Sequence, residues 1–436
     1  MDSQKTNSYG IKIFHSFDGF EFQSFTSSTD TDVIFSYDAD WGNADSHFPY
    51  VYDYFSETFR DRKLFNQEFR AVSDSANFLK DSFLEWVIGA NYLELKETNL
   101  KKDDGLYGDP SDPYGPYASA SSSSSRYKSS NFSVFGNLDY LLSASLKFSI
   151  GLRWEDWEAD YSDSLNELFN PADKMSGGKI SLIKSMTNET NIYASLAKGY
   201  KQGGFNLGLG LDANSTNQNL AYDPEFLTNY ELGINTKLLD SKINFNGVIF
   251  YSYREDQQVL ISTQTDPSDP NTFSFLTQNA AEGVNHGLEI NMDIDIRESL
   301  SAFLNLGMLK TEIKNWQSRQ DLEGRAQAHA PEKSYALGLN WAPTSDTYLA
   351  IDFTGKSSFY YSDSHNNKSK SYVLTNLNLG YVKNNWSYEL WARNVFDEYY
   401  SVRGFYFGNE APNFIDTLYE RHGDPRNIGF SIRYDF

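Results

Sequence analysis

Few side chains in this sequence have the types and spacing that catalysis or metal binding requires. The 436 residues include no cysteine, which excludes disulfides, thiolate metal sites and cysteine nucleophiles. The six histidines are scattered one per region, with no two at ligand spacing, so we predict no structural metal site and no resident cofactor. A hydrolase would need a nucleophile with a positioned histidine. His286 is the only histidine near a predicted strand and we interpret it as structural, so we predict no enzyme activity.

Two other patterns have a functional and a structural interpretation. The Gly203-Gly204 pair could hold a phosphate, but no helical period follows it, so we predict a glycine bend where a strand meets a loop. Three aspartate pairs could bind Ca²⁺, but none has the full spacing of a calcium loop, and turn formation by Asp and Pro is favoured. These pairs are Asp30/Asp32, Asp38/Asp40 and Asp109/Asp112.

The chain is rich in aromatic residues and strongly acidic. It contains 32 Phe, 30 Tyr and 8 Trp, and its 59 acidic and 37 basic residues give a net charge of -22. Disordered segments are poor in aromatic residues, so we do not expect disorder. An acidic chain without a basic run repels phosphates, so no nucleic acid is expected as a partner. No stretch has the roughly 18 to 20 apolar residues of a membrane-spanning helix.

Apolar and polar side chains alternate with a two-residue period in segment after segment. This period predicts β-strands with one apolar face and one polar face. The clearest cases are the segments 146–154, 230–238, 288–297 and 428–436. Counting such segments predicts about 17 strands.

The predicted connections alternate between very short and long. Short ones lie at 18–19, 142–143, 186–189, 240–241, 297–299, 343–346 and 383–385, and long ones near 38–61, 99–129, 205–227, 263–282, 316–330 and 397–424. The segment 105–125, rich in Pro, Gly and Ser, is assigned to one long loop. Outer-membrane barrels have short periplasmic turns, long extracellular loops and an outward apolar band. The predicted fold class is therefore all-β, a transmembrane antiparallel β-barrel.

The direction of each strand follows if the short turns are periplasmic. The last strand, 425–436, then ends in the periplasm, and the segment 9–17 runs from the outside toward the periplasm. A complete barrel of even strand number does not begin outside, so we expect the N-terminus to be cut. Residues 1–10 show no positively charged start, apolar core or small-residue cleavage site of a secretory signal peptide.

Several motifs resemble the mid-barrel of TonB-dependent outer-membrane receptors, in that family's order and spacing. They are IYASLAKGYKQGGFNL (192–207), YDPEFLTNYELGINTK (222–237), INFNGVIFYSYREDQQV (243–259), NAAEGVNHGLE (279–289), WARNVFDEY (391–399) and the terminal strand ending in Phe436. The resemblance covers nearly all of the chain. It implies that residues 1–436 are the C-terminal part of a 22-stranded receptor barrel, with no plug domain and about five strands missing.

The resemblance also implies a function and a set of partners. A complete receptor of this family takes up a scarce nutrient, such as a ferric siderophore, cobalamin or an oligosaccharide, using energy transmitted by TonB. We therefore expect a place in the outer membrane of a Gram-negative bacterium, surrounded by lipid. The TonB complex would be contacted only through the missing plug segment, and the barrel assembly machinery would recognise the terminal strand ending in Phe436. A fragment is not expected to be competent alone, and any iron would belong to the cargo.

Residue type and predicted position suggest two sets of contact residues. Large rigid rings in predicted loops are the expected cargo contacts: Trp41, Tyr107, Tyr114, Tyr117 and Phe205. Charged residues on the polar faces of strands are expected in the lumen: Arg153, Glu231, Arg254, Glu289, Arg297 and Arg393. His329 and His422 are expected to be solvated loop residues, with contact to an iron-bearing cargo as the alternative.

Two other functions stay open at this point. If the segment 9–17 is not a strand, about 16 strands remain from Phe20 onward, and the sheet could close as a passive porin-like pore. A soluble β-rich binding protein would instead bury its apolar faces in a dry core. The fragment interpretation predicts an open or gapped sheet between the segment 9–17 and the terminal strand.

Overall fold

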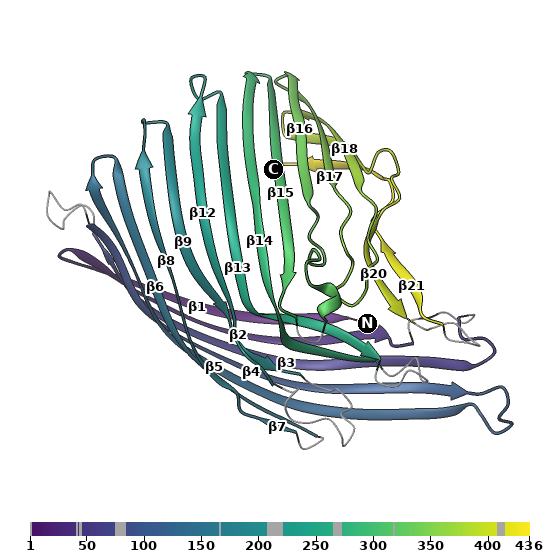
Figure 1. The fold of residues 1–436 in the computed structure, drawn as a ribbon. Helices are drawn as coiled ribbons and strands as arrows, with labels where there is room; N and C mark the ends of the chain where they lie inside the picture. The colour runs from purple at the N-terminus through teal and green to yellow at the C-terminus, as the bar shows by residue number, and fades with distance from the viewer. Residues whose placement is uncertain are drawn as a thin grey trace.

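One large antiparallel sheet dominates the computed structural model (Figure 1). The structure describes residues 2–40, 42, 46–74, 84–164, 167–206, 221–264, 273–316, 319–407 and 415–436. The sheet has 18 strands, of which β7 (Leu168–Phe169) is a two-residue strand beside β6, so 17 longer strands remain. This number agrees with the count of about 17 predicted from the alternation.

Each of the 17 strands pairs with the next one along the sheet, in chain order. They are β1 (Ser3–Phe17), β2 (Phe20–Asp38), β3 (Val51–Ser73), β4 (Leu84–Gly108), β5 (Tyr117–Ser143), β6 (Leu146–Asp163), β8 (Ala172–Ser185), β9 (Thr190–Lys201), β12 (Glu225–Leu238), β13 (Ile243–Gln264), β14 (Phe273–Arg297), β15 (Leu300–Lys314), β16 (Lys333–Thr344), β17 (Thr347–Lys356), β18 (Tyr372–Lys383), β19 (Trp386–Arg393) and β22 (Asn427–Tyr434).

Smaller elements lie in the long connections. β10 (Gly204–Phe205) pairs with β11 (Ala221–Tyr222), and β20 (Ser401–Phe407) pairs with β21 (Thr417–His422). A 3-10 turn, η2 (Gln320–Leu322), follows β15. No helix in the described residues is long and apolar enough to cross a membrane.

The strand register places apolar side chains in continuous rows across the sheet. One row crosses six strands from β5 to β13, and its members are opposite one another in the register. The row consists of Leu138, Ile150, Ile180, Leu196, Tyr230 and Tyr251. Most of these side chains are exposed. We call the face that carries this row the outer face and the opposite face the inner face.

A soluble sandwich would bury such rows against a second sheet, because exposed apolar surface is costly in water. Here the exposed large apolar side chains include Leu152 at 63% and Ile88 at 60%. The buried apolar clusters in the described residues are small and are not made from the outer-face row. The dry core that a soluble β-rich protein requires is therefore not observed.

The connections at one rim of the sheet are short, except for 74–83, and those at the other rim are longer (Figure 1). The two-residue turn 18–19 joins β1 to β2, and Asp74 donates its backbone N–H to the Gly19 carbonyl, which places the end of β3 at the same rim. The alternation of short and long connections is thus confirmed.

Several predicted loop boundaries are wrong, because strands extend into the segments assigned to loops. β4 continues to Gly108 and β5 begins at Tyr117, so the connection is 109–116 and not 99–129. The serine-rich part of 105–125 forms ladder pairs with β4, although it was assigned to a loop. β3 and β14 likewise begin inside predicted loops, at Val51 and Phe273. A strand that has left the membrane has water on both faces, so it needs no apolar alternation.

The sheet is open, with β1 and β22 as its edges. β1 pairs with β2 over all 15 of its residues, and β22 pairs with β19. Neither edge has a second partner strand among the described residues, and both strands are largely exposed. Since β1 is a strand, the count of 16 required for the passive pore is not observed. The prediction of an open sheet at these two strands is confirmed.

Candidate ligand-binding site

The two faces of β6 exchange character toward the long-loop rim. Up to Trp154 the apolar side chains lie on the outer face. Beyond that point the inner face carries Trp157, Ala159 and Tyr161, which are all buried. The outer positions beyond that point are Asp156, Glu158 and Asp160. Alternation continues, but the apolar side now faces inward, where a ligand entering from the long-loop rim would meet it.

Trp157 is the centre of the buried patch on this part of the inner face. It is 2% exposed and packs with Ala159 and with Met175 of β8. Tyr127 of β5 and Tyr200 of β9 pack against the same group. Four strands therefore supply one apolar surface at the long-loop end of the sheet.

Four rings form an adjoining group, which we call the aromatic cluster: Tyr127, Tyr161, Phe169 and Phe205. The Phe205 ring stacks on Phe169 with centroids 5.3 Å apart and an interplanar angle of 17°. Its centroid is 5.2 Å from that of Tyr161 and 6.0 Å from that of Tyr127. Burial and the nearby Asp163 carboxylate raise the pKa of Tyr161, which lies beyond the apolar band, to about 12, so its hydroxyl stays protonated.

The Gly203-Gly204 pair brings Phe205 into the aromatic cluster. The pair follows directly on β9, at the bend that the sequence predicts. A Cβ atom on Gly203 would lie 2.5 Å from the Tyr222 carbonyl oxygen, and one on Gly204 would lie 2.5 Å from the Tyr222 hydroxyl. At Gly203 the obstructing atom belongs to the backbone, so glycine is required there for this close approach of the two segments.

A polar network borders the apolar surface on the side nearer the short turns. Arg153 Nη2 lies 2.7 Å from Glu155 Oε2, and the Tyr200 hydroxyl donates to the same oxygen at 3.0 Å. Asn131 donates to the other oxygen of Glu155. The predicted lumen residue Arg153 is thus held on the inner face by Glu155, a carboxylate that sequence reasoning did not single out.

Two more of the predicted lumen charges lie in similar inner-face pairs. Arg254 Nε donates to Glu225 Oε1 at 2.8 Å, and Gln258 donates its backbone N–H to Glu225 Oε2 at 2.9 Å. Glu231 accepts a hydrogen bond from Asn229 at 2.7 Å. Satisfied pairs of this kind fix side-chain positions on the inner wall.

The other three predicted lumen charges lie elsewhere on the sheet. Glu289 is on β14, opposite Val248 and Gly307 in the register. Arg297 ends β14 at the short-turn rim, where it borders a cavity of about 590 Å³ with Lys242. The Arg393 guanidinium lies 5.6 Å from the Trp391 ring centroid. None of these three joins the aromatic cluster, and their lumen roles stay predictions.

Of the five aromatic residues predicted as cargo contacts, the structure brings one into the aromatic cluster. That residue is Phe205. Tyr107 and Tyr117 are opposite each other at the end of the β4–β5 ladder, and Tyr114 lies in the connection between them, largely exposed. No ring contact within the described residues joins these three to Phe205. Trp41 lies outside the described residues.

The aspartate pair Asp109/Asp112 forms turns in that same connection, as the favoured interpretation predicts. Asp109 Oδ1 accepts the Ser111 backbone N–H at 2.8 Å, and Asp112 Oδ1 accepts the Tyr114 backbone N–H at 2.9 Å. Both aspartate side chains therefore accept hydrogen bonds from the backbone of their own connection.

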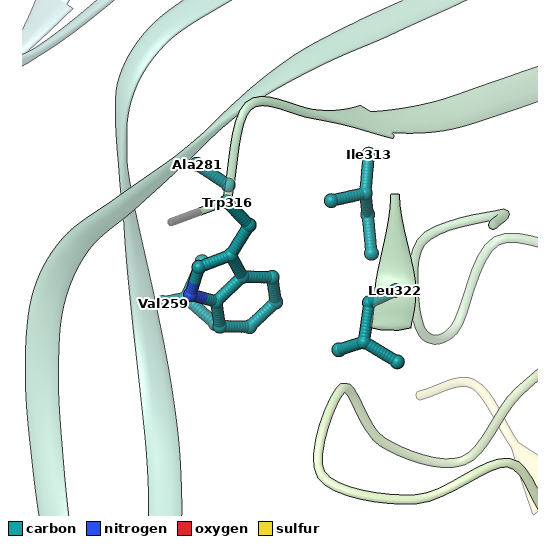
Figure 2. Close-up of a cluster of buried hydrophobic side chains, with 5 residues drawn as sticks. All are labelled: Val259, Ala281, Ile313, Trp316 and Leu322. Carbon is teal, nitrogen blue, oxygen red and sulfur yellow. The ribbon is translucent and has the colours of Figure 1, made fainter. Parts of the chain in front are cut away.

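A second buried cluster lies at the start of the connection after β15 (Figure 2). The Trp316 indole lies between Val259 on one side and Leu322 on the other, with Ile313 and Ala281 completing the group. Trp316 and Leu322 are almost fully buried. The connection is thereby packed onto β13, β14 and β15.

Arg325 joins this connection to the next one, 357–371. Its side chain is 8% exposed and lies 2.8 Å from the Asp363 carboxylate. The guanidinium also donates to the carbonyls of His365, at 2.9 Å, and Ser362, at 3.1 Å. Arg325 is therefore one of several contacts between these two long connections, together with Ala328, whose backbone N–H donates to Asp363 Oδ1 at 3.1 Å.

His329 and His422, for which contact with the cargo was the alternative prediction, take part in loop packing. The His329 ring lies 5.7 Å from that of Phe359, and burial lowers its pKa. His422 contacts the Tyr399 hydroxyl through Nε2. In the described part of the chain no three His, Asp or Glu side chains are grouped so that they could hold a metal ion.

Sequence reasoning did not identify Trp157, Tyr161, Tyr127 or Phe169 as site residues. The sequence did contain a signal for Trp157 and Tyr161. After Glu155, the acidic residues of β6 occupy the alternate positions that belong to the outer face, which leaves the inner-face positions to the two rings. Tyr127 and Phe169 come from separate segments that only the strand pairing brings together.

The family model described as "TonB dependent receptor-like, beta-barrel" matches residues 2–395. The pesticin receptor of Yersinia pestis is 23% identical over 59% of this chain and 36% of its own length. The ferric-pyoverdine 358 receptor of Pseudomonas putida is 22% identical over 81% of this chain and 42% of its own length. The chain spans less than half the length of these relatives.

Solved structures with the same fold cover essentially the whole chain. The ferric yersiniabactin uptake receptor FyuA from Yersinia pestis has a TM-score of 0.74 at 16% identity, and it covers 100% of this chain and 62% of the receptor. The siderophore receptor PiuA from Acinetobacter baumannii has a TM-score of 0.73 at 17% identity, with 99% and 64% covered. The chain therefore belongs to the TonB-dependent receptor-like β-barrel family of receptors and transporters, which are not enzymes.

Proposed function

We propose that this chain is the barrel portion of an outer-membrane receptor that takes up a ferric siderophore. One observation carries the proposal: the inner face becomes apolar and aromatic at the long-loop end, around Trp157 and the aromatic cluster. Large rigid rings bind a compact ligand at low cost in side-chain entropy. The relatives named as receptors for ferric yersiniabactin and ferric pyoverdine support this cargo class.

The proposal includes a place in the outer membrane. Exposed apolar rows on the outer face, with polar pairs on the inner face, match the requirements of a strand with lipid on one side and water on the other. Relatives in this family are outer-membrane proteins of Gram-negative bacteria. The short-turn rim would then be periplasmic and the long-loop rim extracellular.

The proposal also includes additional strands that close the barrel. With 17 antiparallel strands, β1 and β22 run in the same direction, so only an odd number of added strands gives antiparallel pairing at both edges. Five strands would satisfy this condition and complete the 22 strands typical of a plugged barrel. Transport driven by TonB would then act through a plug domain inside the closed barrel.

The cargo site is tested by binding to the purified chain in detergent. Quenching of intrinsic fluorescence would be measured with ferric hydroxamate, catecholate and phenolate siderophores. Phe205→Ala is expected to weaken binding of the preferred complex about tenfold or more, because truncating a central aromatic contact typically costs more than 1 kcal/mol. Leu168→Ala is the matched control, since Leu168 is adjacent to Phe169 but 72% exposed. Equal binding by both variants, or no binding of any complex, would contradict the proposal.

A further inference from the structure

Two pairs of acidic side chains border the aromatic cluster. In the first pair, Asp163 Oδ2 accepts the Tyr161 hydroxyl at 3.2 Å, and Asp163 Oδ1 accepts the backbone N–H of Glu167 at 2.9 Å. Burial and the nearby Asp163 carboxylate raise the pKa of Glu167, which lies beyond the apolar band. Two carboxylates held this close repel each other, and a cation beside them relieves the repulsion.

The second pair consists of Asp173 and Asp223. Asp173 of β8 is opposite Trp157 in the register, so its side chain belongs to the inner face. Its Oδ2 atom lies 2.8 Å from the position that a Cβ atom on Gly203 would occupy. Burial and the Asp223 carboxylate raise the pKa of Asp173. This second pair therefore lies beside the bend that carries Phe205.

The nearby inner-face arginines are paired with other carboxylates. The pairs on β3, β4 and β6 are Arg70 with Glu68, Arg60 and Arg62 with Glu97, and Arg153 with Glu155. Lys201, the last residue of β9, is exposed and lies opposite Glu225 in the register. Within the described residues, no lysine or arginine forms an ion pair with Glu167, Asp173 or Asp223. The border of the aromatic cluster is therefore acidic.

Trp157 supplies a hydrogen-bond donor to the same surface. Its indole Nε1 is buried, and no described residue accepts a hydrogen bond from it. A buried donor without an acceptor costs free energy, so an oxygen atom that reaches this donor is bound favourably. Trp157 packs against Tyr127, a member of the aromatic cluster. The surface thus suits a ligand that carries both a cationic group and acceptor oxygens.

Rings together with carboxylates favour an organic cation over a metal ion. The negative face of an aromatic ring attracts an ammonium or a guanidinium, which has little water to lose. A hard metal ion instead requires several oxygen ligands, and the described residues contain no acidic or histidine group of that kind. Phe169 and Phe205 are only partly buried, so their rings are accessible to a ligand.

We propose that the carboxylates bordering the aromatic cluster bind a positively charged group of the cargo, an ammonium or a guanidinium. The inference rests on the proposed function and narrows the cargo to ferric complexes that carry a cationic arm. The cation would lie against the rings with a carboxylate beside it. A neutral complex lacks this contribution, and an anionic complex is repelled by the same carboxylates.

The test compares two ferric complexes that differ in one charge. The first is a linear trihydroxamate ending in a primary amine, and the second is the same compound acetylated at that amine, so the iron site is unchanged. Binding to the full chain in detergent is measured by quenching of intrinsic fluorescence at about pH 7.5, where the amine is protonated. The variant E167Q/D173N removes one carboxylate from each pair. The control E158Q/D160N removes two carboxylates from the outer face of β6.

We expect the unchanged chain and the control to bind the amine complex about tenfold more tightly than the acetylated one. E167Q/D173N should lose this preference and bind the acetylated complex as the unchanged chain does. Equal binding of the two complexes by the unchanged chain, or an undiminished preference in E167Q/D173N, would overturn the inference.

The inference and the proposed function fail in different ways. If the unchanged chain bound another ferric complex but not the amine complex, the inference would be wrong and the proposed function would stand. If no ferric complex of any class bound, the proposed function would be wrong and the inference would fall with it.

Discussion

Glu155 marks the level at which β6 changes its surroundings. Below it the outer face is apolar, and above it the outer face is acidic while Trp157 and Tyr161 turn inward. Its carboxylate accepts from Arg153, Asn131 and the Tyr200 hydroxyl, so the charge at this transition is paired.

At the same scale, two loop histidines make loop stability depend on pH. Burial lowers the pKa of His365 and of His329 below the ordinary value of 6.5. Between the lowered pKa and 6.5, the open loop takes up a proton and the packed loop does not. The stability that these residues contribute is therefore complete above the ordinary value and is lost as the pH falls.

We predict that hydrogen exchange of residues 357–371 accelerates between about pH 7.5 and about pH 5.5, after correction for intrinsic exchange. His365→Gln should remove a large part of this acceleration. His286→Gln is the control, because His286 lies on β14, away from these loops. The same acceleration in His365→Gln would show that another group is responsible.

Individual site residues were only partly predictable from the sequence. Phe205 could be identified as a loop aromatic next to a glycine pair, and it does lie in the aromatic cluster. Its neighbours Tyr127 and Tyr161 are ordinary strand residues until the β5–β6 register places them opposite each other. Such contacts depend on pairing between distant segments, which local patterns do not encode.

At the scale of elements, the strands that cross the membrane were predictable and their extensions were not. Alternation identifies 146–154 because lipid and water impose opposite demands on the two faces. The extension 117–125 has water on both faces. Its serines therefore pair with β4 in the sheet although no apolar residues alternate along the segment. The prediction of a loop from the Pro, Gly and Ser content was therefore wrong for this part of β5.

The long connections are elements with their own packing. Arg325 bridges 319–329 and 357–371, and Trp316 anchors the first of them on the sheet. The Arg325–Asp363 pair is largely buried, and removing one partner of such a pair leaves an uncompensated charge. The two connections should therefore open together or not at all.

We predict that Arg325→Met lowers the free energy of opening these two connections by about 3 kcal/mol, measured by hydrogen exchange of their amides. Arg433→Met is the control, because the Arg433–Asp435 pair is exposed and away from both connections, and such pairs are worth at most about 1 kcal/mol. Exchange in β17 and β18 should change little. If only one of the two connections lost protection, Arg325 would not couple them.

At the scale of the whole molecule, the fold follows from one requirement that all strands share, which is an apolar outer face and a polar inner face. Each outer face is apolar over a band of limited height, and the inner faces carry polar pairs such as Arg254 with Glu225. The same demand explains the composition, since many aromatic and many acidic residues can coexist in one chain when they occupy different faces or heights. The fold class and strand number were therefore predictable, whereas the loop packing was not.

The central claim is that the outer face meets lipid up to the level of Glu155 and water above it. Because the chain has no cysteine, single cysteines report on chosen positions without background. Leu152→Cys and Asp160→Cys lie on the same face of β6, eight residues apart. Each would carry a bimane label in the membrane-inserted protein, and quenching by brominated lipid would be compared with quenching by aqueous iodide.

We predict that brominated lipid quenches the label at position 152 and that iodide quenches the label at position 160. Both labels should respond to iodide once the protein is unfolded in denaturant, which controls for labelling. If brominated lipid quenched neither position, or iodide quenched both in the inserted protein, the outer face would not be a lipid-facing surface and the account would be contradicted.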